Sequence, residues 1–149
     1  MQLKKNKSTK NIEIYSLEKS KLQKRPIVNE DIAAGFPSPA EDFKEVRISL
    51  DKELVKNEEA TFYARVRGNS MVDANIEDGD LLVIDRSIES RNGKVAVCMI
   101  DGEFTIKRLK IEKECVYLMP ENKSYKPIKV EEGNELIIWG IVTYVIKKV

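Results

Sequence analysis

The chain has 149 residues, 42% of them apolar and 34% charged, which suits one hydrophobic core with a modest appendage. It contains no histidine, so a Ser-His-Asp triad and a zinc site with histidine ligands are excluded. The net charge of +1 does not argue for nucleic acid, but residues 1–30 hold eight Lys and Arg against three Asp and Glu. The sequence therefore predicts a basic arm on a mildly acidic body. Such an arm is typical of a solvated terminus, and it could also contact nucleic acid or an acidic protein surface.

The arm, residues 1–34, is rich in Lys, Asn, Ser and Glu, and its apolar positions are poorly spaced. A short apolar cluster could form a strand or a helical turn, but we expect it to build no core; it consists of Ile12, Ile14, Tyr15 and Leu17. The segment is too short for the packed helices of a helix-turn-helix head, so we expect no sequence-specific DNA binding. It also lacks the apolar stretch of a signal peptide.

Residues 35–45 are predicted to form an extended linker, because Pro37 and Pro39 push the residues before them toward extended backbone. From residue 46 to residue 149 the pattern is that of one β domain. A short helix is expected from Asp51 to about Asn57, a tight hairpin at the Asn92-Gly93 turn, and a bulge or bend at Gly140. The expected strands cover residues 46–50, 62–67, 81–84, 95–100, 103–111, 115–119, 127–130 and 136–146. Short strands at this spacing predict a compact, mainly β fold of mostly antiparallel strands.

Cys98 and Cys115 lie in apolar, strand-like runs without CxxC spacing, so we expect buried free thiols and no metal site. No run of about 18 apolar residues is present, so we expect no membrane contact. Both observations favour a cytoplasmic protein.

Ser70 follows a predicted strand and a glycine, in the segment Gly68-Asn69-Ser70-Met71. Gly68 permits a sharp turn, which would present the hydroxyl at the rim of the sheet. The backbone N–H groups of Asn69 and Ser70 are candidates for an oxyanion hole. Taken alone, the same pattern is also typical of an ordinary turn serine. Without histidine, a serine nucleophile needs another base, and an unprotonated lysine is the known alternative.

Lys107 is the candidate base, in the predicted strand 103–111. Alternation places it on one face with Thr105 and Leu109, between apolar positions. Partial burial would lower the pKa of its amine, and the neutral amine could accept the serine proton and later deliver it to the leaving amine. The alternative is a lysine that snorkels to water at a sheet edge.

Ala34-Gly35 is the candidate scissile bond, because two small residues precede an extended segment of the kind that a protease groove binds as a strand. Together, these three elements resemble the LexA-like self-cleaving Ser-Lys peptidases of the S24 type, and among them the UmuD-like mutagenesis proteins of the bacterial DNA-damage response. The segments that carry the resemblance are residues 35–40, 68–71, 78–82 and 101–107. The resemblance covers about residues 33–149. UmuD-like proteins often have cysteine where this chain has Ala34, and the arm before the bond is longer and richer in lysine than usual.

The resemblance implies that Ser70 is the nucleophile and Lys107 the general base of self-cleavage at Ala34-Gly35. It also implies a homodimer whose cleavage is stimulated by a RecA filament on single-stranded DNA. Cleavage would remove the flexible arm, and residues 35–149 would join a UmuC-like Y-family translesion polymerase as an accessory subunit. No cofactor or metal is expected.

Two other functions stay open at this point. One is a headless LexA-type repressor relative that acts as a regulatory binding module through mixed dimers. The other is a protease that acts on other proteins. Retention of Ser70, Lys107 and the Ala34-Gly35 bond in one chain argues against pure binding, and a built-in cleavage site argues against the general protease.

Overall fold

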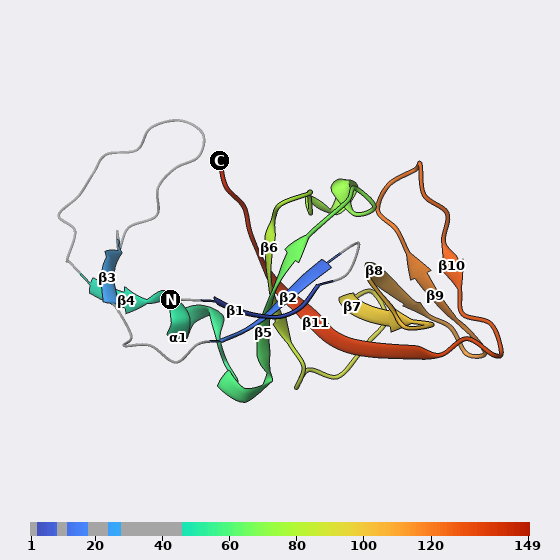
Figure 1. Ribbon diagram of the computed structural model, residues 1–149, viewed down its shortest axis with the longest axis horizontal. Helices are drawn as coiled ribbons and strands as arrows, with labels where there is room; N and C mark the ends of the chain where they lie inside the picture. The colour runs from blue at the N-terminus through green and yellow to red at the C-terminus, as the bar shows by residue number, and fades with distance from the viewer. Residues whose placement is uncertain (1–2, 9–11, 18–23, 28–45) are drawn as a thin grey trace. The chain divides into compact units, whose positions relative to one another are not determined.

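The computed structural model describes residues 3–8, 12–17, 24–27 and 46–149 (Figure 1). They belong to two compact units. The larger unit is drawn from residues 1–19 and 57–149, and the smaller from residues 20–56. None of the helices in the described part of the chain is long and apolar enough to cross a membrane.

The larger unit is a sheet of nine strands in the order β1-β2-β5-β6-β11-β7-β8-β9-β10, and every neighbouring pair is antiparallel. The strands are β1 (Leu3–Ser8), β2 (Ile12–Leu17), β5 (Thr61–Val66), β6 (Leu81–Asp85), β7 (Val95–Ile100), β8 (Glu103–Ile111), β9 (Val116–Met119), β10 (Ile128–Lys129) and β11 (Leu136–Ile146). The predicted mainly β, antiparallel fold is confirmed.

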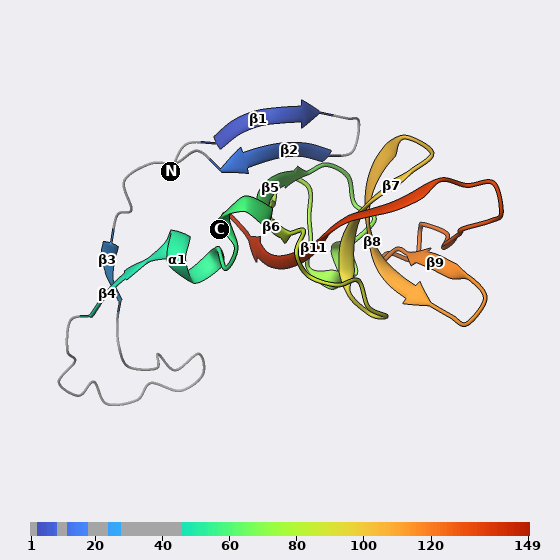
Figure 2. The same ribbon diagram turned by 90° about the horizontal axis from the view of Figure 1, so that it is seen from below.

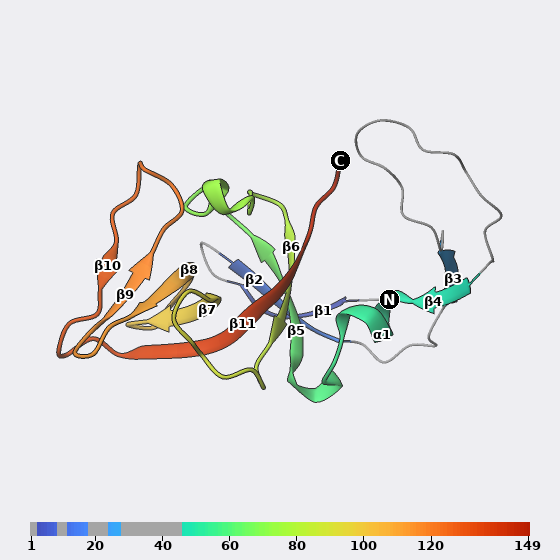
Figure 3. The same ribbon diagram turned by 180° about the vertical axis from the view of Figure 1, so that it is seen from behind.

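The long strand β11 lies between β6 and β7 and joins the two halves of the sheet (Figure 3). Its first part pairs with β7 and its second part with β6, and its register shifts between Ile138 and Gly140 and again between Val142 and Tyr144. The bulge predicted at Gly140 is thus confirmed. A Cβ atom at this position would lie only 2.5 Å from Cγ2 of Ile84, so the close approach requires glycine.

The position of β11 makes one turn prediction wrong. The Asn92-Gly93 turn connects β6 to β7, which are not paired, so it does not close a hairpin. The tight hairpin joins β7 to β8 instead, through Asp101 and Gly102, with Ile100 opposite Glu103. Both turn residues have left-handed φ angles, 49° and 83°, as a two-residue hairpin of this twist requires.

The core of the larger unit includes two groups of packed, buried side chains. The first is Ile12, Ile14, Ala64, Val66, Met71, Ile76, Leu82, Ile84, Val97, Phe104 and Ile106. The second is Ala96, Cys98, Leu109, Leu118 and Ile141. Cys98 is a buried free thiol, as expected, whereas Cys115 is only half-buried.

The first core group corrects the expectation that the arm's apolar cluster builds no core. Ile12 is completely buried and Ile14 is 3% exposed. A strand of six residues cannot form a core alone, but β2 pairs with the edge of β5 and adds both isoleucines to a core that already exists.

The smaller unit contains β3 (Lys24–Ile27), β4 (Val46–Ser49) and α1 (Leu50–Leu54). β3 and β4 form an antiparallel pair, and β4 confirms the strand predicted at residues 46–50. The predicted helix begins one residue early and ends at Leu54, where Val55 adopts extended backbone. The arm boundary at residue 34 and the linker 35–45 lie outside the described residues.

Candidate active site

A tight loop after β5 carries Ser70. Gly68 has a φ of 96°, a left-handed conformation that favours glycine. Its N–H donates a hydrogen bond to Oδ1 of Asp78 at 2.8 Å, and the N–H of Gly79 donates to the carbonyl of Val66 at 2.8 Å. These two hydrogen bonds connect the turn at Asp78-Gly79 to the loop that carries Ser70. Ser70 therefore lies just beyond the end of β5, at the rim of the sheet, as predicted.

The loop after β9 holds the Ser70 loop from the other side. The N–H of Glu121 donates to the carbonyl of Ser70 at 2.8 Å, and Nδ2 of Asn122 donates to the carbonyl of Asn69 at 2.7 Å. A trans peptide aligns its C=O and N–H in opposite directions, so the bond from Asn122 fixes where the Ser70 N–H points. The N–H groups of Asn69 and Ser70 donate to no acceptor within the described ranges.

Neither Glu121 nor Asn122 was predicted from the sequence, since no motif marks them. Glu121 also accepts a hydrogen bond from Nε of Arg108 at 2.5 Å, and its carbonyl accepts from the N–H of Asp73 at 2.8 Å. Only the fold brings this loop to Ser70.

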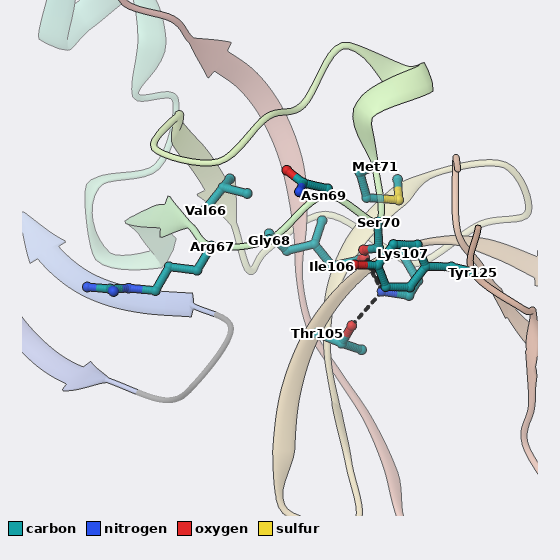
Figure 4. Close-up of a pocket in the computed structure, with 10 residues that line it drawn as sticks. All are labelled: Val66, Arg67, Gly68, Asn69, Ser70, Met71, Thr105, Ile106, Lys107 and Tyr125. Atoms are coloured by element: carbon teal, nitrogen blue, oxygen red, sulfur yellow. Dashed lines mark hydrogen bonds between the residues drawn. The ribbon is translucent and has the colours of Figure 1, made fainter. Parts of the chain in front are cut away.

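Lys107 enters the site from β8, the predicted strand. Its Nζ lies 2.9 Å from Oγ of Ser70, 2.8 Å from Oγ1 of Thr105 and 3.0 Å from the carbonyl oxygen of Ile106 (Figure 4). The structure therefore brings together the two side chains that the sequence singled out, although they are 37 residues apart. It also adds Thr105, which the sequence placed on the same face without a role.

Burial dominates the electrostatics of Lys107, which is only 6% exposed. Loss of water around the ammonium form lowers the pKa of the amine from its ordinary value, and the nearby Cys98 acts weakly in the opposite direction. Burial also raises the pKa of the Cys98 thiol to about 12, so at neutral pH this thiol is uncharged. No carboxylate in the described part of the chain pairs with Lys107.

The three partners of Nζ match the bonding capacity of a neutral amine. A neutral lysine has two N–H donors and one lone pair. In the ammonium form Nζ donates to all three oxygens; in the neutral form Thr105 Oγ1 and the Ile106 carbonyl oxygen can accept the two N–H bonds, and the lone pair can accept the hydrogen of the Ser70 hydroxyl. Chemically, this arrangement can take a proton from Ser70 and return it to another group.

A pocket of about 100 Å³ opens beside Ser70 and Lys107. Its wall combines polar and apolar surface, and Met71, Ile106 and Tyr125 are among the lining residues. Arg67 also lines it, but its side chain extends away from Lys107 and forms an ion pair with Glu13 on β2 (Figure 4). Ala34 and Gly35, the candidate scissile residues, lie outside the described residues.

The peptidase S24-like family matches residues 26–143 of this chain. The chain is 40% identical to protein MucA of Salmonella typhimurium over 127 residues, which cover 84% of this chain and 86% of MucA. It is 38% identical to protein SamA of the same organism over 123 residues, 83% of this chain and 85% of SamA. It is also 40% identical to the LexA repressor of Alcanivorax borkumensis over 122 residues, 82% of this chain and 58% of the repressor.

The family match covers β5 to β10, most of β11 and the Ser70 and Lys107 segments in one continuous stretch, and it begins after β1 and β2. The chain belongs to the peptidase S24-like family, as a UmuD-like member of this class of self-cleaving serine peptidases.

Proposed function

We propose that this chain cleaves its own Ala34-Gly35 bond, with Ser70 as the nucleophile and Lys107 as the general base. The observation that carries the proposal is the contact of 2.9 Å between the buried Lys107 amine and the Ser70 hydroxyl. Burial lowers the pKa of Lys107, so this amine becomes neutral at a lower pH than an ordinary lysine, and the neutral form is what a base requires.

The proposed reaction has two stages. Oγ of Ser70 attacks the carbonyl carbon of Ala34 while Nζ of Lys107 takes the hydroxyl proton, and the N–H groups of Asn69 and Ser70 stabilise the oxyanion. The Lys107 ammonium then gives its proton to the leaving amine of Gly35. In the second stage, Lys107 takes a proton from water, which attacks the ester carbon; the bond to Oγ of Ser70 then breaks, and the Lys107 ammonium returns the proton to Oγ. The products are a carboxylate at Ala34 and a new N-terminus at Gly35.

The proposed domain organisation follows from this cut. Residues 1–34 are the basic arm that self-cleavage cuts from the rest of the chain, residues 35–45 are the extended linker that enters the site, and residues 46–149 are the Ser-Lys peptidase domain. A backbone with Ala and Gly at the bond can lie flat in the narrow pocket, because neither side chain obstructs its approach to Ser70.

We further propose that the chain acts in the DNA-damage response as a homodimer in the cytoplasm. A RecA filament on single-stranded DNA would favour the conformer in which the linker occupies the pocket, without supplying chemistry. The truncated form would serve as an accessory subunit of a UmuC-like translesion polymerase. Similarity to MucA, SamA and a LexA repressor supports this assignment.

The test is mass spectrometry of the purified chain held at about pH 10, with Ser70→Ala and Lys107→Ala beside it. At this pH even an unperturbed lysine, with a pKa of about 10.4, is partly neutral, so the wild type should cut slowly without a partner. We expect a cut after Ala34 in the wild type alone. An uncut wild type would contradict the proposal and favour the binding module. If the wild type does cut itself, a RecA filament should accelerate the same cut at neutral pH.

A further inference from the structure

Strand β2 belongs to the arm, yet it lies in the sheet between the end strand β1 and β5. It pairs with β5 in continuous antiparallel register, from Ile12 opposite Val66 to Ser16 opposite Phe62. Figure 2 shows β1 and β2 side by side, with β2 next to β5. With Ile12 and Ile14 in the core, departure of β2 would expose both the edge of β5 and the apolar side chains beneath it.

A polar contact also holds β2. Glu13 is 8% exposed and forms an ion pair with Arg67. The hydroxyl of Tyr15 also donates a hydrogen bond to Oε2 of Glu13 at 2.7 Å. A carboxylate this buried is costly unless it is paired, so Glu13 and Arg67 stabilise each other's positions. Arg67 comes directly after β5 and is among the residues that line the pocket beside Ser70, while its side chain extends away from Lys107 to Glu13.

A second strand pairing joins the two sides of the proposed cut. β3 lies before residue 34 and β4 after residue 35, and they pair from Lys24 opposite Ser49 to Ile27 opposite Val46. Pro26 within β3 lacks an N–H, and a two-stranded ladder is marginal alone, so this is the weaker attachment. Two attachments on one fragment nevertheless raise the effective concentration of each.

We propose that cleavage severs the arm without releasing it: residues 1–34 stay bound, with β2 seated on β5. This inference rests on the proposed cut between residues 34 and 35. Removal of the arm is then a separate dissociation step, which exposes the edge of β5 and frees Arg67 from Glu13. The occupant of the β5 edge in the freshly cut protein is therefore the arm's own strand.

The test separates retention of the arm from self-cleavage. In the full chain with Ser70→Ala, a sequence-specific protease site is inserted between residues 34 and 35 and cut by the added protease. The product is passed through size exclusion at roughly 20 µM, a concentration at which a micromolar complex stays together. We expect the arm to co-elute with residues 35–149. Separate elution would overturn the inference, whether or not the unmodified chain cuts itself.

Matched variants identify the attachment. Ile14→Ala and Leu17→Ala each remove three carbons from β2, but Ile14 is in the core whereas Leu17 is only half-buried and outside it. Ile14→Ala should weaken retention at least about tenfold and Leu17→Ala less than about threefold. An equal loss of arm retention in the two variants would contradict the binding of the arm through the pairing of β2 with β5. Amide hydrogen exchange provides an independent test in the cut protein without these two substitutions. The amides of β5 that face β2 should stay protected from exchange. Rapid exchange of these amides would also refute the inference.

Discussion

Removal of one acceptor from Lys107 should change the pH dependence of self-cleavage in a direction that the structure dictates. Thr105→Val keeps the shape of the side chain but removes Oγ1, which lies 2.8 Å from Nζ of Lys107. The ammonium form loses a hydrogen bond from a charged donor, and the neutral form loses one from an uncharged donor. The charged form therefore loses more, and the pKa of Lys107 should fall further below its ordinary value.

The magnitude follows from the typical strengths of these bonds. A hydrogen bond from a charged group contributes about 1.5–3 kcal/mol and one from a neutral group about 0.5–1.5 kcal/mol, so the difference is about 1 kcal/mol. That corresponds to a decrease of roughly 0.7 pKa unit. The neutral amine also loses one of the two hydrogen bonds that orient its lone pair toward Ser70. The rate of self-cleavage at high pH should therefore fall by about threefold to tenfold.

The assay is the rate of arm cleavage, followed by mass spectrometry between neutral and alkaline pH, with circular dichroism to confirm folding at each pH. We expect the Thr105→Val profile to reach its midpoint at lower pH and to level off at a lower rate than the wild-type profile. Thr105→Ser retains an acceptor and should follow the wild type closely. An unchanged midpoint in Thr105→Val, or a midpoint at higher pH, would refute the assigned role of Oγ1.

Three further changes should have distinct effects. Asn122→Ala should lower the cleavage rate about threefold to thirtyfold without moving the pH midpoint, because it releases the Asn69 carbonyl and hence the Ser70 N–H; Asn134→Ala, which removes an amide bonded to Asp101, is the control. Lys107→Met should be more stable than the wild type toward urea at neutral pH. Because the pKa of Lys107 is lowered in the folded state, the unfolded wild type binds more protons than the folded wild type between that pKa and about 10.4. The free energy of unfolding of the wild type should therefore rise relative to that of the variant as pH rises through this window. Parallel plots of unfolding free energy against pH would contradict a buried amine with a lowered pKa. Gly140→Ala should destabilise the fold by about 1–3 kcal/mol through contact with Ile84, measured as a lower urea midpoint, and an unchanged midpoint would mean that the bulge can relax.

The parts of the fold that could be predicted are those in which local pattern and final structure agree. The strand 103–111 alternates apolar and polar residues from Phe104 to Lys107, and Gly68 marks the turn before Ser70, so both elements of the site could be predicted from local sequence. The resemblance to the family then placed Ser70 and Lys107 together. The bulge at Gly140 was predictable because glycine interrupts a long apolar strand.

The parts that could not be predicted depend on partners distant in the sequence. β2 has too few apolar residues to indicate a core strand, and only the edge of β5 gives Ile12 and Ile14 a place to be buried. The Asn92-Gly93 turn has hairpin chemistry, yet β11 occupies the position that a hairpin partner would take. Asn122 acts through its contact with Asn69, 53 residues earlier, and nothing in its local sequence marks that contact.

The place of β11 in the sheet has a consequence for the order of events during synthesis. Ser70 follows β5, which pairs with β6, whereas Lys107 lies in β8, which pairs with β7; in the sheet these two pairs meet only through β11. Residues 136–146 follow both strand pairs in the chain, so they leave the ribosome after both pairs. Until β11 has emerged, the growing chain carries its nucleophile and base on strand pairs that the sheet does not yet join, and we expect nascent protein to be unable to cut itself before that point.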